Sequence, residues 1–259
     1  MLASAALLSG ERAHAQTQIS ADSIRALAFD RFDRTSRSLL ATVWCARNAG
    51  ELRATGVVGP TDSVGRTGLC VRKDGRALAV YFTPDSTYSK AGNVRVADVA
   101  GRVRYRGPID TVAVLAEARA SMDAVLRGFA LFQKEKRAFA PVSMRSDGDS
   151  IQVWLLPLGL FALPTPTAIG GERAYVYSPD GRTLVREIDA FDRHRALTVP
   201  DTGLVEIVSR EDDLPLVSEL IATNLIHTSG REVRVVTAAV ISQLVRGPPE
   251  AWVQLKRRP

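Results

Sequence analysis

Beyond its first residues, the chain of 259 residues has no apolar segment long enough to cross a membrane. Its strongest hydrophobic runs are interrupted by Arg or Pro within a few residues, whereas a membrane-spanning helix needs about 20 continuous apolar residues. The composition, 46% hydrophobic and 24% charged, is ordinary for a globular protein. We therefore expect a soluble, folded protein.

The usual signatures of catalysis and nucleotide binding are missing as well. The sequence contains no G-x-S-x-G, S-x-x-K, P-loop or G-x-G-x-x-G pattern. Its three histidines, His14, His194 and His227, do not have metal-ligand spacing to one another or to Cys, so we expect neither a metal site nor a cofactor. A hydrolase that combines His194 or His227 with a Ser and an acid from distant segments remains an alternative, because such sites are recognised by geometry.

The first 15 residues have the pattern of a secretory signal peptide. A short apolar run, residues 2–8, is followed by Gly10 and by Ala13-His14-Ala15, which has small residues at the two positions that signal peptidase reads. Since no Lys or Arg precedes the run, we expect the leader to be truncated at its start. No cysteine follows Gly10, which argues against a lipid anchor. These residues predict an exported protein, periplasmic or extracellular.

Only two cysteines are present, Cys45 and Cys70. In an exported chain such a pair predicts a disulfide, which would contribute about 3 kcal/mol by restricting the unfolded chain. Both cysteines lie in segments that resemble strands, so we expect the bond to join neighbouring strands. The alternative is two buried free thiols.

The net charge is +6, and 29 of the 34 basic residues are Arg. Their dispersal along the chain argues against a nucleic-acid interface, which needs a concentrated basic surface. Arg102, Arg104 and Arg106 alternate with Val103 and Tyr105, which predicts a strand with three guanidinium groups on one face. Such a row is the candidate binding site for an anionic polymer or lipid head group. The alternative is a solvated face balanced by nearby acids: Asp98, Asp110 or Glu117.

Residues 16–108 are expected to form an N-terminal α+β region. Apolar residues at helical spacing predict a helix over about 20–37. Segments rich in Val, Thr, Leu and aromatic residues predict strands at 39–46, 52–58, 67–72, 77–83, 94–99 and 102–106. Lys73-Asp74-Gly75-Arg76 is typical of a hairpin turn.

Residues 109–137 are predicted to form one long amphipathic helix that Asp110 opens. Apolar residues spaced three and four apart define one face: Leu115, Ala118, Met122, Val125, Phe129 and Phe132. We expect this face to pack on the protein's own sheet, with dimerisation through it as the alternative. Arg119, Asp123 and Arg127 lie four apart on another face, where their charges can pair.

Residues 138–259 are expected to form a C-terminal α+β region. Hairpins are predicted at 142–156 and 173–188, further strands at 204–209, 232–237 and 251–255, and a helix over about 212–227. The apolar, Pro- and Gly-rich loop 156–171 either packs on the core or faces a partner. His227, in the last helical turn, is expected at the surface, where it complements the helix dipole.

Strands in series with segregated helices indicate an α+β fold of mainly antiparallel sheets, with one long central helix and a second helix in the C-terminal half. The function predicted from the sequence is non-catalytic binding or an accessory role in the cell envelope. Its expected partner is an anionic envelope component or another envelope protein. A hydrolase and a structural dimerisation domain are the alternatives.

Overall fold

The computed structural model describes residues 21–60, 65, 67–135, 138–146, 149–162, 164–188, 194–209, 215–238, 240–245 and 251–256. The predicted leader lies outside these residues, as does Asp212, the expected start of a helix. Within the described ranges, helices and mostly antiparallel sheets form the predicted α+β fold. No helix in these ranges combines the length and the apolar character that crossing a bilayer requires.

The N-terminal sheet is antiparallel and its strands follow chain order. They are β1 (Thr67–Lys73), β2 (Arg76–Pro84), β3 (Ala91–Asp98) and β4 (Val103–Arg104). Asp74 and Gly75 connect β1 to β2 with φ angles of 50° and 74°, the two positive values that a tight hairpin turn requires. The predicted turn is confirmed. The strand predicted over 102–106 is shorter, because Arg102 has a φ of 47° and lies outside β4.

Helix α1 (Ala21–Ala54) extends far beyond its predicted end. It includes residues 39–46 and the start of 52–58, so the prediction of strands there is wrong. Leu39 and Val43 lie four residues apart, and both are fully buried in the core, which is helical spacing. The preference of Val, Thr and Trp for strands is weaker than the gain from burying this face.

Cys45 and Cys70 form the predicted disulfide, with the sulfur atoms 2.03 Å and the Cα atoms 6.0 Å apart. The expectation that it joins two strands is wrong, because Cys45 lies in α1 and Cys70 in β1. Both cysteines belong to a core that also contains Leu52 and Tyr81. The bond therefore fixes the C-terminal half of α1 to the N-terminal sheet.

Helix α2 (Thr111–Glu135) is confirmed to within a few residues of its predicted start and end. It lies between two sheets. One side packs on the N-terminal sheet through Val114, Leu115 and Ala118. The other side packs on the next sheet through alanines four residues apart, Ala116, Ala120 and Ala124.

The predicted apolar face of α2 is only partly correct. Leu115 and Ala118 are buried, but Met122 and Phe129 are 45% and 52% exposed. Small alanine side chains let the helix approach the sheet closely, which turns the bulkier side chains of this half of the helix outward. Of the three charged residues spaced by four, Asp123 pairs with Arg127 at 2.6 Å, while Arg119 contacts other partners.

The middle sheet contains the two predicted hairpins. Its strands are β5 (Phe139–Arg145), β6 (Ile151–Pro157), β8 (Arg173–Tyr177) and β9 (Leu184–Ile188), antiparallel and in that order. The loop between β6 and β8 forms a short helix, η2 (Leu158–Phe161), and β7 (Ala168–Ile169), which pairs with β10 (Arg195–Ala196). Leu160 and Ile169 are buried, so much of this loop packs on the core.

The C-terminal sheet contains the parallel strand pair. Its elements are β11 (Val205–Val208), α3 (Val217–Thr228), β12 (Val233–Val236), β13 (Val240–Val245) and β14 (Ala251–Lys256). β11 and β12 are parallel with α3 as their crossover, and β12, β13 and β14 are antiparallel. His227 is only 4% exposed, so its expected surface position is wrong. Both α1 and the sheet, through β12 and β13, contact α3.

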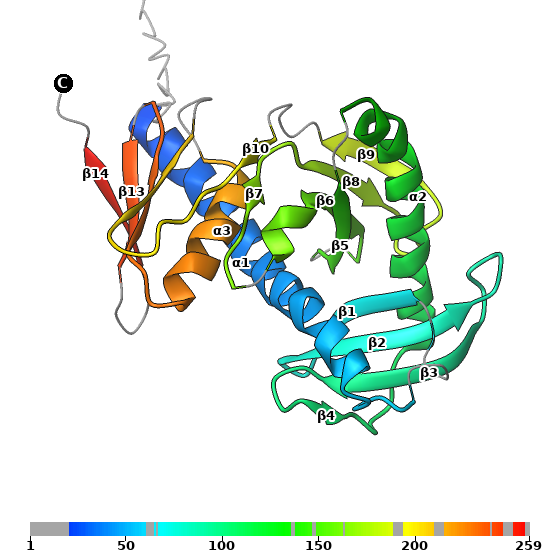
Figure 1. Cartoon of the computed structure of the whole chain (residues 1–259). Coiled ribbons are helices and arrows are strands. Elements are labelled where there is room, and N and C mark those ends of the chain that lie inside the picture. Colours follow the sequence, from blue (N-terminus) through cyan, green and yellow to red (C-terminus); the bar gives the residue numbers. More distant parts are fainter. Residues whose placement is uncertain are drawn as a thin grey trace, which may run out of the picture.

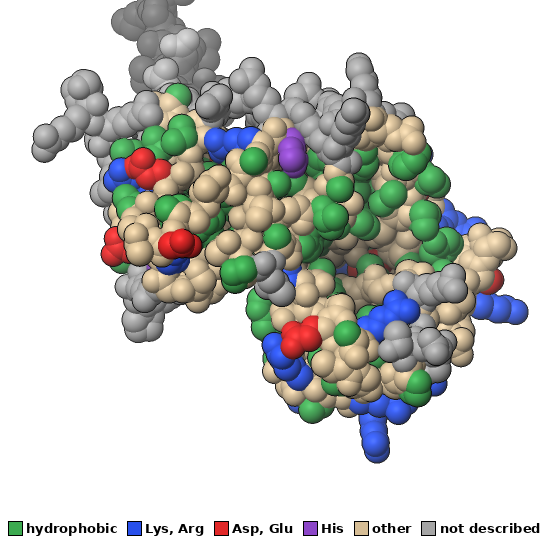
Figure 2. Space-filling view, viewed as in Figure 1, with side chains coloured by type: hydrophobic (Ala, Val, Ile, Leu, Met, Phe, Trp, Pro, Cys, Tyr) green, Lys and Arg blue, Asp and Glu red, His purple; other side chains and the backbone are tan. Residues whose placement is uncertain are grey.

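Figure 1 shows that α1 runs diagonally from the C-terminal sheet, past the middle sheet, to the N-terminal sheet. Two long helices, α1 and α2, therefore organise the molecule where one was predicted. The division of the chain at residues 109–137 stays a prediction. Figure 2 shows a hollow on this face where the N-terminal sheet joins the rest, with basic side chains spread over the part that carries that sheet.

Candidate functional site

The described residues form a cavity of about 610 Å³ beside the start of α2, which we call the α2 cavity. Its walls are the loop between β2 and β3, the first turns of α2, and the turn between β8 and β9. The charged residues that line it are Asp110, Arg119, Arg145, Asp180 and Arg182. Three arginines against two aspartates leave one excess positive charge, and the volume is typical of small-molecule sites.

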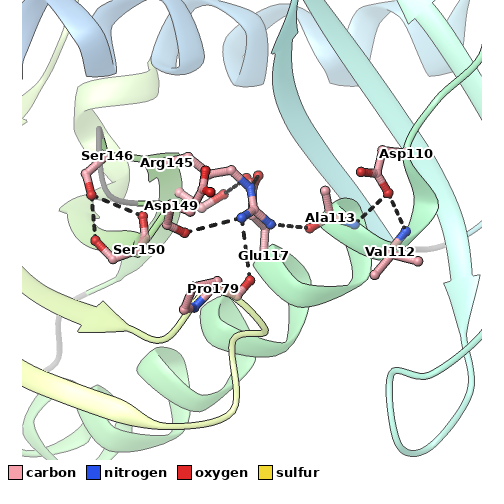
Figure 3. Close-up of polar contacts among 10 residues, drawn as sticks. Asp110, Val112, Ala113, Glu117, Arg145, Ser146, Asp149, Ser150 and Pro179 are labelled. Atoms are coloured by element: carbon pink, nitrogen blue, oxygen red, sulfur yellow. Dashed lines mark hydrogen bonds and ion pairs between the residues drawn. The ribbon is translucent and has the colours of Figure 1, made fainter.

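Asp110 immediately precedes α2 and caps it, as predicted (Figure 3). Its Oδ1 accepts hydrogen bonds from the N–H groups of Val112 and Ala113, both at 3.0 Å. These helix N–H groups therefore have partners within the protein. An anion in the cavity would consequently be held by arginine side chains.

Arg119 connects the two loops that border the cavity. Its guanidinium donates to the carbonyl of Asp180 at 2.6 Å and to the carbonyls of Thr87 and Tyr88. Among the described residues, no carboxylate lies within ion-pair distance of Arg119. Its charge is therefore not cancelled by a direct ion pair, although at longer range it helps to lower the pKa of the Asp180 carboxyl.

Arg145, at the end of β5, reaches across to α2 and to the β8–β9 turn (Figure 3). It donates to the carbonyls of Ala113, Asp149 and Pro179 at 3.3, 3.3 and 3.5 Å. Typical N–H···O distances are about 2.9–3.0 Å, so all three contacts are long. An anionic oxygen in the cavity would be a stronger acceptor for this guanidinium.

Arg182 lies at the rim of the cavity, 3.7 Å from Asp180 and 64% exposed. Hydrogen bonds from the Ser178 hydroxyl and from the Arg182 N–H hold the pKa of Asp180 below its ordinary value. Asp180 is thus a fixed negative charge beside Arg182 over the neutral pH range. The charges of Arg182 and Asp180 offset each other at the rim, so Arg119 and Arg145 are the remaining cations of the lining.

Glu117 is the buried acid of this region, with a side chain only 9% exposed. Its Oε2 accepts a hydrogen bond from the Ser143 hydroxyl at 2.9 Å, and its Oε1 accepts one from Arg145 Nε at 3.2 Å. Burial raises the pKa of the Glu117 carboxyl, against the lowering effects of Ser143 and Arg145. Perturbed carboxyls of this kind are concentrated at functional sites.

A second cavity, of about 350 Å³, lies where Glu117 and Ser143 meet α1 and β1. Thr42, Cys70 and Arg72 also line it. Arg145 lines both cavities, so the Arg145–Glu117 contact lies where the two cavities adjoin.

The predicted arginine row lies on the N-terminal sheet, away from the lining of both cavities. Arg102, Arg104 and Arg106 are all exposed. Arg102 forms an ion pair with Glu51 at 2.7 Å, rather than with any of the three acids expected to balance the row. Arg104 lies in β4 and Arg106 beyond it, so regular strand alternation does not extend over all three. Anion binding by this row stays a prediction.

The histidines of the hydrolase hypothesis, His194 and His227, line neither cavity. His194 lies with its ring 6.2 Å from that of Phe139. Among the described residues, no group of three or more His, Cys, Asp or Glu side chains is arranged to hold a metal ion.

Sequence reasoning did not identify Glu117, Arg119, Arg145 and Arg182 as one site. Arg119 contacts Asp180, which is 61 residues away, and Arg145 contacts Ala113, which is 32 residues away. No local spacing indicates such pairs. The one usable signal was that Arg145 and Arg182 each adjoin a predicted turn.

Comparison of the chain with protein-family models, with curated proteins and with solved structures found no match.

Proposed function

We propose that the protein is an exported, non-catalytic binding protein that holds a small anionic ligand in the α2 cavity. The observation that carries the proposal is the convergence of three arginines on one cavity, of which Arg119 has no ion-pair partner among the described residues. The planar guanidinium matches carboxylate and phosphate oxygens, so the ligand class is a small molecule with such a group.

Export is part of the proposal and rests on two observations. The Cys45–Cys70 disulfide is typical of proteins that fold in an oxidising compartment. The pattern at residues 1–15 is that of a secretory leader. An anionic component of the cell envelope is the natural source of the ligand for a protein with net charge +6.

A hydrolase and a structural dimerisation domain stay the alternative functions. The hydrolase would need its site elsewhere, because neither His194 nor His227 lines the α2 cavity or the second cavity. The exposed Met122, Leu126 and Phe129 of α2 would be the surface for dimerisation.

Calorimetric titration with sulfate tests the proposal, because sulfate keeps its charge over the working pH range. We expect Arg145→Lys to weaken sulfate binding by about tenfold or more, since lysine keeps the charge but loses the planar set of donors. Arg182→Ala should weaken it by a smaller factor, because this side chain is mostly exposed.

Arg186→Ala is the matched control. Arg186 is an exposed arginine in β9, close in sequence to Arg182 but outside the cavity lining. We expect wild-type sulfate affinity from this variant. Equal sulfate affinities of the wild type, Arg145→Lys and Arg186→Ala would contradict the assignment of the α2 cavity.

A further inference from the structure

Arg145 is shared between the α2 cavity and the carboxylate of Glu117. Its Nε donates to Glu117 Oε1 at 3.2 Å, while its terminal nitrogens contact the carbonyls of the turns and of α2. The Glu117 side chain is 9% exposed and the Arg145 side chain 29%, so water screens this ion pair less than it would screen a pair at the surface. An anion bound to Arg145 in the α2 cavity therefore changes the electrostatic environment of the Glu117 carboxylate.

The groups that face Glu117 come from three neighbouring elements. β5 contributes Ser143 and Arg145, which both donate hydrogen bonds to it. β1 contributes Arg72, a residue that lines the same cavity, and α1 contributes only uncharged hydroxyls there, from Ser38 and Thr42. Among the described residues, Arg145 is the one cation within ion-pair distance of this carboxylate.

We propose that Glu117 couples the binding of an anion in the α2 cavity to the uptake of a proton. The inference rests on the proposed function. A bound anion engages the same guanidinium that stabilises the Glu117 carboxylate, and it adds a second negative charge nearby. The neutral carboxyl then becomes the favoured form. A proton from solvent binds to a carboxylate oxygen of Glu117, and no other covalent bond changes.

The groups that set the pKa of Glu117 determine whether anion binding takes up or releases a proton. In the free protein, burial raises its pKa, and Ser143 and Arg145 oppose that rise. When an anion offsets part of the Arg145 charge, the pKa rises further. Affinity for the anion should therefore increase as pH falls through the window between the free and bound pKa values, and should be constant below it.

Calorimetry of sulfate binding to the full chain, in pairs of buffers with different ionisation enthalpies, counts the protons directly. From about pH 8 down to about pH 5, we expect uptake of up to one proton and sulfate binding that tightens about tenfold for each unit by which binding raises the pKa. In Glu117→Gln, the amide oxygen can still accept a hydrogen bond. This variant should bind sulfate without proton uptake and, at the high end of the range, at least as tightly as the wild type.

Glu187→Gln provides the matched control, because it removes a carboxylate on β9 that pairs with Arg173, away from both cavities. It should show the wild-type proton count. Ser143→Ala offers a second variant: it removes one hydrogen bond to the charged carboxyl, so the window of proton uptake should move to higher pH.

The possible results distinguish a failure of the role of Glu117 from a failure of the proposed function. Proton uptake that persists in Glu117→Gln, or sulfate binding by the wild type without proton uptake, would overturn the role of Glu117 and leave the proposed function standing. Absence of sulfate binding by the wild type would remove both. If Glu117→Gln does not fold, the wild-type proton count and the shift of the proton-uptake window in Ser143→Ala test the role of Glu117.

Discussion

At the residue scale, three buried glutamates combine charge with almost complete removal from solvent. Glu117, Glu172 and Glu219 are all almost completely buried, and burial raises the pKa of each. Each has donors that compensate: Ser143 and Arg145 for Glu117, Ser218 for Glu172, and Arg195 with the Leu216 N–H for Glu219. The sequence does not indicate this burial, because a single Glu without a charged partner at fixed spacing has the pattern of a surface position and the compensating donors come from distant segments.

Glu172 leads to a stability prediction. It accepts hydrogen bonds from the N–H of Ser218 at 3.0 Å and from its hydroxyl at 2.7 Å, with Glu219 as a neighbouring negative charge. Because its folded-state pKa is raised, its stabilising effect is complete below the unfolded-state pKa and is lost as pH rises through the folded-state value. Each unit of difference corresponds to about 1.4 kcal/mol.

Between about pH 4 and pH 8, the unfolding free energy of Glu172→Gln should therefore fall less than that of the wild type. At about pH 8 the variant should be the more stable of the two. Urea unfolding at several pH values measures this. Glu172→Ala is the contrasting variant, because it leaves the Ser218 donors without their acceptor and should destabilise at every pH by about 1–3 kcal/mol. A Gln variant that follows the wild-type pH profile would show that Glu172 does not titrate in this range.

At the scale of elements, predictions succeeded where local signals decide the structure. α2 was predicted closely because Asp110 caps it and its apolar spacing is regular, and the β1–β2 hairpin because Asp74-Gly75 specifies the turn. α1 was predicted poorly beyond residue 37, because burial against two cores outweighed the strand preference of its residues. β13 was missed, and the α2 face that packs on the middle sheet consists of alanines, which carry little hydrophobic signal.

The turn between β8 and β9 packs directly on α2, and Gly181 makes this possible. A Cβ atom at Gly181 would lie 2.0 Å from the carbonyl oxygen of Ala116, at a φ of +70°. Gly75 has a similar φ of +74° but nothing within 4 Å of the same position. Alanine substitutions at Gly75 and Gly181 therefore separate the strain of the positive φ angle from the steric cost of the contact with Ala116.

We expect Gly75→Ala to lower the unfolding free energy by about 1 kcal/mol, from strain alone. Gly181→Ala should lower it by at least about 2 kcal/mol, because the turn must also move away from α2. That movement should weaken the Arg119–Asp180 contact and sulfate binding with it. Denaturant titrations of both variants make the comparison, and equal losses would contradict close packing of the turn on α2.

At the scale of the whole molecule, the fold class was predictable and the site was not. Antiparallel hairpins connected by short turns can be recognised from local sequence patterns, so the α+β class and most strands were predictable. The α2 cavity instead depends on how the N-terminal and middle sheets pack on opposite sides of α2, which brings together Tyr88, Arg119 and Arg182 from separate segments. Long-range packing of this kind has no counterpart in local spacing.

The disulfide lies within one of the two cores that α1 enters. Cys45 and Cys70 belong to the core of the N-terminal sheet, whereas Leu39 and Val43 of α1 belong to the core shared with α3.

The double variant Cys45→Ala/Cys70→Ala should lose about 3 kcal/mol of unfolding free energy, and reduction of the wild type should cause the same loss. In amide hydrogen exchange, protection should fall first in β1 and the end of α1, while α3 keeps its protection. A thiol reductant should leave the double variant unchanged. Equal stability of the oxidised and reduced wild type would show that packing alone fixes α1 on the sheet, and would remove the structural reason for export to an oxidising compartment.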